Sequence, residues 1–201
     1  MSVKWTARAL NGILTVVLMT DPGLAATHAK HAASPAIPVT AMTTHSAARQ
    51  KLEAIEKRGE EVPAGVRLRF ETRLASFADQ IDLEAGSASN TVAQRLSAEF
   101  GVNVPDLAVE HERTHASWGD LMIAHTLQSN ARFAISPAQI FELHQGGMAW
   151  TMVAHGLGLS VEPFVSAVEN ETRVALGQDK ADGKVPAIGP AAANDVSDSM
   201  N

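Results

Sequence analysis

Two stretches of the sequence decide the fold: residues 105–118 read PDLAVEHERTHASW, and residues 137–150 read PAQIFELHQGGMAW. A proline, a glutamate and a tryptophan recur in them at a spacing of 32: Pro105 with Pro137, Glu110 with Glu142, Trp118 with Trp150. Past the tryptophan the spacing falls to 30, so that Ile123-Ala124-His125 matches Val153-Ala154-His155. Repeats of this length usually form supersecondary units that bury their apolar faces only by packing on one another.

Each copy begins with signals for the start of a helix. A capping residue stands just before a proline in three places: Asn103 and Pro105, Ser136 and Pro137, Ser160 and Pro163. Asn and Ser side chains accept hydrogen bonds from first-turn amides, and proline is tolerated there because some of those amides have no helical partner. Ser136 and Gln139 also fit a capping box. Because residues 158–161 (GLSV) resemble residues 101–104 (GVNV), we expect units at 103–127 and 136–157 and a partial copy at 158–176.

Apolar residues upstream of the repeats also recur at helical spacing. They predict three helices, marked by Ala48, Leu52 and Ile55 (ended near Gly59), by Val66, Phe70, Leu74, Phe77 and Ile81, and by Val92, Leu96 and Phe100 (ended by Gly101). Trp118 and Trp150 begin apolar stripes in the repeats, so we expect both rings in the core. No segment alternates as a strand does. Two and a half units are too few for a solenoid, and the pattern predicts an all-α domain at 46–176, a small bundle of helical hairpins.

The two ends of the chain differ from this domain. Lys4 and Arg8 accompany an apolar run at 9–20, shorter than the roughly 20 residues of a membrane span, and Ala25 ends a small-residue site. This pattern is typical of a secretory signal peptide at 1–25, with an uncleaved anchor as the alternative. Residues 26–45 are rich in Ala, Thr, His and Pro and are expected to form a flexible spacer, and residues 177–201 a disordered tail.

Composition narrows the classes of partner. The chain has 201 residues and a net charge of −6. It contains no cysteine, which excludes structural disulfides and a lipid-modified cysteine. A mildly acidic protein is poorly suited to nucleic acid or to anionic membrane surfaces. We therefore expect a periplasmic or secreted protein with no stable membrane insertion after signal cleavage.

The segment 147–159, GMAWTMVAHGLGL, resembles a recurring element of bacterial exported proteins, Gly-Met-Gly-Trp-Gly-x-Ile-Ala followed by a Leu-Gly turn. Ala149 and Thr151 replace the two glycines that flank the tryptophan in that pattern, whereas Gly119 keeps the second one after Trp118. The resemblance covers about residues 103–175. It implies export and a helical architecture, and it carries no known activity.

The sharpest chemical motif is residues 111–115, HERTH, a match to H-E-x-x-H. On one unbroken helix, His111 and His115 share a face and can hold zinc, while Glu112 acts as general base on the bound water. The repeat argues against this zinc metallopeptidase, because His115 aligns with Gly147 in a Gly-Gly pair where helices commonly stop. If the first copy stops at the same place, the two imidazoles diverge.

Two further hypotheses are weaker. Five histidines lie within a short span, and imidazole suits zinc, copper and nickel: His111, His115, His125, His144 and His155. This favours a histidine-based metal-binding envelope protein, against the simpler interpretation that His125 is a satisfied core histidine. The segment 150–173 also has the rhythm of a helix-turn-helix, but its second helix carries Glu162, Glu169 and Glu171, which would repel phosphates.

The preferred hypothesis is a non-enzymatic helical module that binds an unknown protein or another envelope component. It assigns no catalytic residue and no cofactor. The alternatives are the zinc metallopeptidase and the metal-binding protein, both of which place zinc on His111 and His115.

Overall fold

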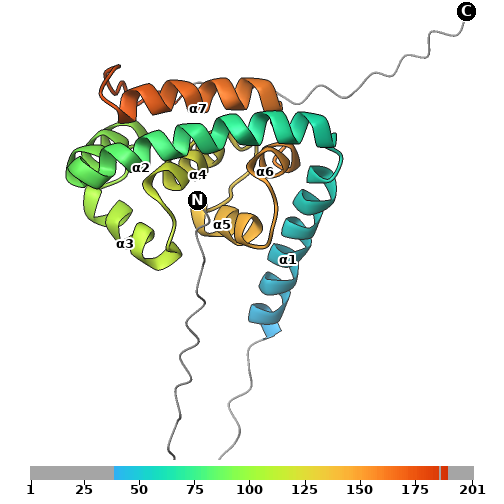
Figure 1. Cartoon of the computed structure of the whole chain (residues 1–201). Helices are drawn as coiled ribbons and strands as arrows, with labels where there is room; N and C mark the ends of the chain where they lie inside the picture. Colours follow the sequence, from blue (N-terminus) through green and yellow to red (C-terminus); the bar gives the residue numbers. More distant parts are fainter. Residues whose placement is uncertain (1–38, 186, 190–201) are drawn as a thin grey trace, which may run out of the picture. The chain divides into compact units, whose positions relative to one another are not determined.

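Seven helices and no strand make up the described part of the chain, residues 39–185 and 187–189 of a computed structural model (Figure 1). The helices are α1 (Val39–Gly59), α2 (Ala64–Phe100), α3 (Val104–Thr114), α4 (Trp118–Asn130), α5 (Pro137–Gln145), α6 (Trp150–Gly156) and α7 (Val161–Ala175). The predicted all-α class is confirmed for these residues. α1 begins at Val39, within the stretch 26–45 expected to be a spacer. The expected signal peptide, the rest of the spacer and residues 190–201 lie outside the described part.

The long helix α2 joins two helices that the sequence predicted separately. It is continuous except at Ala88, whose φ of −143° and ψ of 43° are not helical. Ala88 lies in the run Gly86-Ser87-Ala88-Ser89, and kinks commonly occur at glycine and serine pairs. The Ser87 hydroxyl donates to the Glu84 carbonyl oxygen at 3.0 Å, just before the kink. The helix ends as predicted at Gly101, which adopts a positive φ of 66°.

The helix starts fall at the positions that match in the sequence. α4 and α6 both begin at the matched tryptophans, and α3 and α5 both carry a proline in their first turn. The predicted capping box of Ser136 is present, whereas the Asn103 amide donates to Asp106 at 3.3 Å instead of capping. Gly101 and Gly158, which match in the sequence, both have positive φ, and each precedes a helix by three residues.

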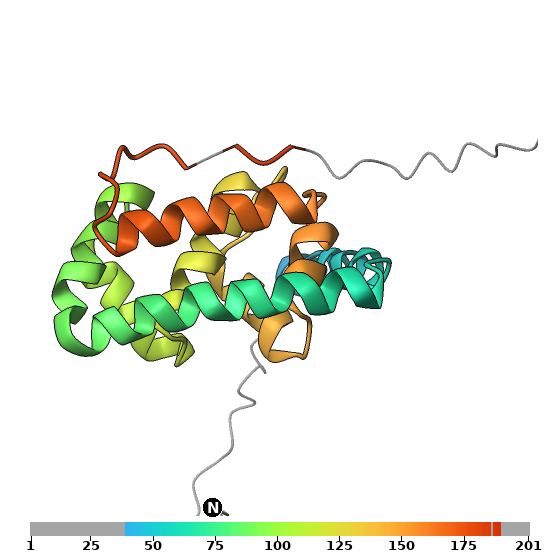
Figure 2. The ribbon, with the colours of Figure 1, turned by 45° about the horizontal axis from the view of Figure 1, so that its top comes forward.

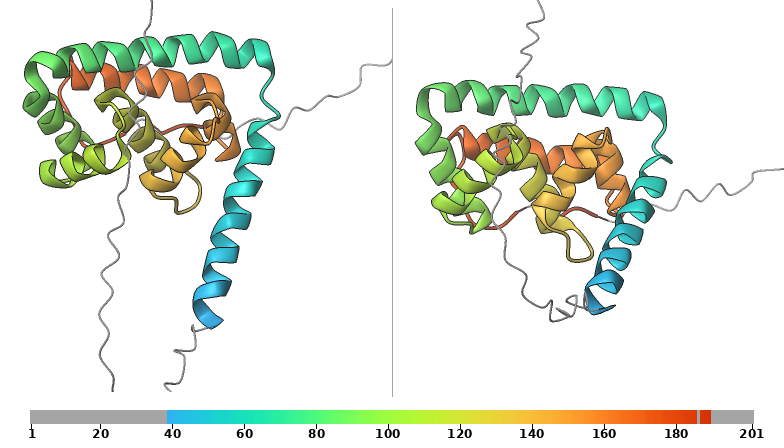
Figure 3. Two further views of the ribbon diagram at one scale, coloured as in Figure 1. Left: turned by 60° about the horizontal axis from the view of Figure 1, so that its bottom comes forward. Right: turned by 90° about the horizontal axis from the view of Figure 1, so that it is seen from below.

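The core lies mainly between α2, α4 and α7. α7 runs along α2 (Figure 1), and Figure 3 shows the repeat helices on the same side of α2 as α7. α4 is buried on every face from Leu121 to Leu127, and the predicted inward residues of α7 are fully buried: Phe164, Val165 and Val168. Of the predicted stripe on α2, Phe70, Leu74 and Ile81 are buried and Phe77 is partly buried, whereas Val66 in the first turn is 36% exposed.

Two glycines bring α1 and α6 close together. A Cβ on Gly156 would lie 2.3 Å from the Ile55 carbonyl oxygen, and one on Gly59 would lie 2.7 Å from the Met152 carbonyl oxygen. Both contacts are with backbone, so neither can be relieved by rotating a side chain. α1 is therefore held against the second repeat unit by backbone proximity, and its exposed face lies beside α5.

Candidate functional site

The HERTH residues lie at a helix end and do not share a helical face. α3 stops at Thr114, and His115 follows it with a left-handed φ of 53°. The matched residue in the second unit, Gly147, also has a positive φ, of 103°. The predicted helix end is thus confirmed, and the helical H-E-x-x-H geometry is absent because the chain turns before its second histidine.

The first histidine has another contact. The His111 ring stacks on Trp118, with ring centroids 4.8 Å apart and planes inclined by 24°. His111, Glu112 and His115 border a surface cavity of about 560 Å³. Within residues 39–185 and 187–189, no three His, Asp or Glu side chains are grouped so that they can hold a metal ion. The metallopeptidase hypothesis gains no support from this arrangement.

The other histidines are dispersed and individually engaged. His125 is buried and lies 2.9 Å from the Glu110 carboxylate, as expected for a satisfied core histidine. His144 stacks on Trp150 at 3.7 Å between ring centroids, and its Nδ1 lies 2.8 Å from the Met148 carbonyl oxygen. His155 lies 3.6 Å from Glu61. The five histidines therefore form no common site.

The structure shows polar contacts that the sequence did not predict. The first-turn amide of Thr151 in α6 donates to Glu71 Oε1 at 2.7 Å, and that of Gly119 in α4 donates to Asp82 Oδ1 at 2.9 Å. Both acceptors lie on α2. Carboxylates stabilise helix N-termini because free amides and the helix dipole are positive there. The two repeat units are thus anchored to α2 by the same chemistry.

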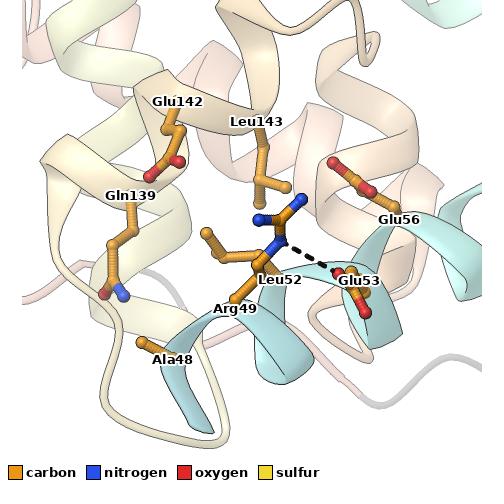
Figure 4. Close-up of a pocket in the computed structure, with 8 residues that line it drawn as sticks. All are labelled: Ala48, Arg49, Leu52, Glu53, Glu56, Gln139, Glu142 and Leu143. Atoms are coloured by element: carbon orange, nitrogen blue, oxygen red, sulfur yellow. Dashed lines mark hydrogen bonds and ion pairs between the residues drawn. The ribbon is translucent and has the colours of Figure 1, made fainter. Parts of the chain in front are cut away.

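The most suitable binding site is an acidic groove between α1 and α5, defined by Ala48, Arg49, Leu52, Glu53, Glu56, Gln139, Glu142 and Leu143 (Figure 4). Its volume is about 560 Å³. Leu52 and Leu143 approach each other at its floor, from α1 and α5, while the carboxylates flank them on both sides (Figure 4). Such a combination of an apolar floor and a polar rim is typical of a site for another chain.

The charges of the acidic groove are unbalanced. It contains three glutamates and one arginine, and Arg49 pairs with Glu53 at 3.2 Å. Glu56 and Glu142 are exposed, and neither forms an ion pair with any described residue. The groove therefore presents two free carboxylates beside apolar surface. The sequence repeat gave no signal for it, because α1 lies outside the repeat.

The described helices include none that is long and apolar enough to cross a bilayer. The chain matches no protein-family model, no curated protein and no solved structure.

Proposed function

We propose that this chain is an exported, non-enzymatic interaction module that binds a basic, partly apolar segment of another envelope protein in the acidic groove. The observation that carries the proposal is the position of Glu56 and Glu142, on opposite walls of an apolar floor and without ion-pair partners in the described chain. A lysine or arginine on the partner would complete these charges, and an adjacent leucine or isoleucine would cover Leu52.

The net charge of −6 supports the same partner chemistry, since it favours encounter with a basic surface. The groove is open to solvent, so its charges act mainly on the association rate and on specificity, and the apolar floor supplies most of the free energy of binding.

Export remains part of the proposal, and mass spectrometry tests it. A mature protein that begins at Ala26 or Thr27 is expected, and an intact residue 1–25 segment would contradict a cleavable signal.

The binding test uses the mature protein and two short peptides. One has leucines on one face and lysines on the other, and the second replaces every lysine by glutamate. We expect the basic peptide alone to bind, with NMR shift changes on α1 and α5. Binding should weaken with salt because exposed charges are screened. Equal binding of both peptides, or shift changes centred on His111 and His115, would contradict the proposal.

A matched pair of variants separates the groove from net charge. Glu56→Gln with Glu142→Gln removes two charges in the groove, and Glu60→Gln with Glu162→Gln removes two exposed charges elsewhere. The first pair should raise Kd about tenfold, mainly through the association rate, and the second should change it little. All four side chains are exposed, so the fold should be unaffected. Similar losses in both pairs would show that only overall charge matters.

A further inference from the structure

The described residues that follow α7 form a strap, defined here as residues 178–185 and 187–189. The strap turns back along α7 (Figure 2). Gln178 and Asp179 at its start are hydrogen-bonded to Arg173 of α7. Beyond them three hydrogen bonds hold the strap to the helices: the Asp182 amide donates to Glu99 Oε2 at 3.0 Å, the Ile188 amide to Asn130 Oδ1 at 2.8 Å, and the Ser160 amide to the Gly189 carbonyl oxygen at 3.2 Å. Ile188 also packs against the core. The strap therefore has no regular secondary structure, but hydrogen bonds and one apolar contact attach it to the helices.

The hydrogen bond between Asp182 and Glu99 lies close to a second buried carboxyl group, that of Glu171. Glu99 of α2 is 3% exposed and Glu171 of α7 is 1% exposed. Glu171 Oε2 is buried and has no hydrogen-bond partner among the described atoms. In an ionised carboxylate, Oε2 would lack both water and a donor, which is unfavourable. Glu171 is therefore expected to carry a proton while the strap is closed.

The groups around Glu171 provide no compensating cation. α2 contributes Glu99 and Arg95. The Arg95 guanidinium donates to the Ala175 carbonyl oxygen at 2.9 Å and forms an ion pair with Glu84 at 3.8 Å. The strap contributes Asp182. The buried titratable group of α4, His125, is hydrogen-bonded to Glu110. Ionisation of Glu171 would thus add a negative charge next to two carboxylates.

Burial, together with the charges of Glu99 and Asp182, raises the pKa of Glu171 from its ordinary 4.5 to about 8. The folded pKa is above the unfolded one, so the folded state holds the extra proton. The stability that this proton contributes is complete below about pH 4.5 and is lost as the pH rises through about 8. Mild alkali is therefore the condition that stresses this contact.

We propose that the strap is a pH-sensitive latch, closed while the Glu171 carboxyl is protonated and released when it ionises. Release separates Asp182 from Glu99, admits water to the two glutamates and withdraws Ile188 from the core. Because the strap beyond Asp179 is attached through only three hydrogen bonds, it opens there without unfolding α2 or α7, as expected for a segment of low local stability. The latch lies apart from the acidic groove and does not depend on the proposed function.

Limited proteolysis of the whole mature chain tests the latch. Lys180 and Lys184 lie in the strap with exposed side chains, so trypsin reports its opening. Cleavage at these lysines, corrected for the activity of trypsin on an unstructured peptide, should accelerate as the pH rises through about 8. The increase should reach at most about tenfold per pH unit, the limit for one proton. A rate that does not change across this range would overturn the proposal.

Two variants identify the responsible group. Glu171→Gln keeps the size of the side chain and cannot ionise, so its cleavage rate should stay low at every pH. Glu162→Gln removes an exposed charge from the same helix and should behave as wild type. Carbon-13 NMR of the carboxyl groups provides an independent readout, in which Glu171 should titrate near pH 8. Equal alkaline acceleration in Glu171→Gln, or a Glu171 midpoint at its ordinary value, would contradict the latch.

Discussion

The two repeat units begin their helices in the same way, but their second helices pack against different partners. In the first unit, α4 is buried on every face and contacts α2, α5 and α7, while in the second the shorter α6 packs mainly against α1. In both, a histidine of the first helix stacks on the tryptophan that starts the second, whose first turn donates to a carboxylate of α2. The two units therefore share their helix starts and differ in the packing around them.

The tryptophans give the largest expected difference between the units. Trp150 is 5% exposed, whereas Trp118 is only partly buried at the edge of the core. We expect Trp150→Ala to lower the free energy of unfolding by about 4 kcal/mol, since it empties a large buried site. Trp118→Ala should cost about half as much, roughly 2 kcal/mol, because part of its surface is already in water. Urea denaturation measures both, and equal losses would mean that the rings are equally buried.

The residue after each tryptophan is a second difference between the two units. The first unit has Gly119 there, and a Cβ would lie 2.4 Å from Ala78 Cα on α2, whereas the second unit has Thr151. Gly119→Ala should destabilise the protein by about 2 kcal/mol, because the helix backbones must separate. The control is Gly65→Ala, where nothing lies within 4 Å and a small gain is expected. Thermal melting distinguishes the two, and a neutral Gly119→Ala would show that α4 shifts freely.

The carboxylates of α2 should contribute equally to the two units. Asp82→Ala and Glu71→Ala each remove an acceptor from a first-turn amide and should cost about 1 kcal/mol. Asp79→Ala, at an exposed position on the same helix, should have little effect. Hydrogen exchange adds a local readout, because the Gly119 amide should lose protection only in the Asp82 variant. Loss of protection at both amides in either variant would show that the units are coupled.

The smallest expected effect concerns the HERTH turn. His115 has the positive φ that its counterpart Gly147 adopts at no steric cost, so His115→Gly should stabilise the protein by roughly 0.5–1 kcal/mol. His111→Ala with His115→Ala should leave melting nearly unchanged, apart from the lost Trp118 stack. Metal analysis of the mature protein should find no stoichiometric zinc. One tightly held equivalent that disappears in the double variant would restore the peptidase hypothesis.

Local signals predicted much of this fold. The helix ends at Gly59, Gly101 and His115 follow from residue type and from the repeat, because caps and left-handed turns depend on a few neighbouring residues. The acidic groove and the carboxylates of α2 were not predictable in this way. They join residues far apart in the sequence, such as Glu71 and Thr151, and surface acids of a helix look alike until the fold selects their partners.

The two acceptors on α2 also set a register. Asp82 and Glu71 lie eleven residues apart in sequence, which is about three helical turns and roughly 16 Å, so both occupy one face of the helix. The spacing of the two acceptors along α2 therefore sets the distance between the first turns of α4 and α6. A single residue inserted between the acceptors would rotate one of them by about 100° and uncouple one unit. Insertions and deletions in this stretch of α2 are therefore expected to be tolerated less well than substitutions within the units.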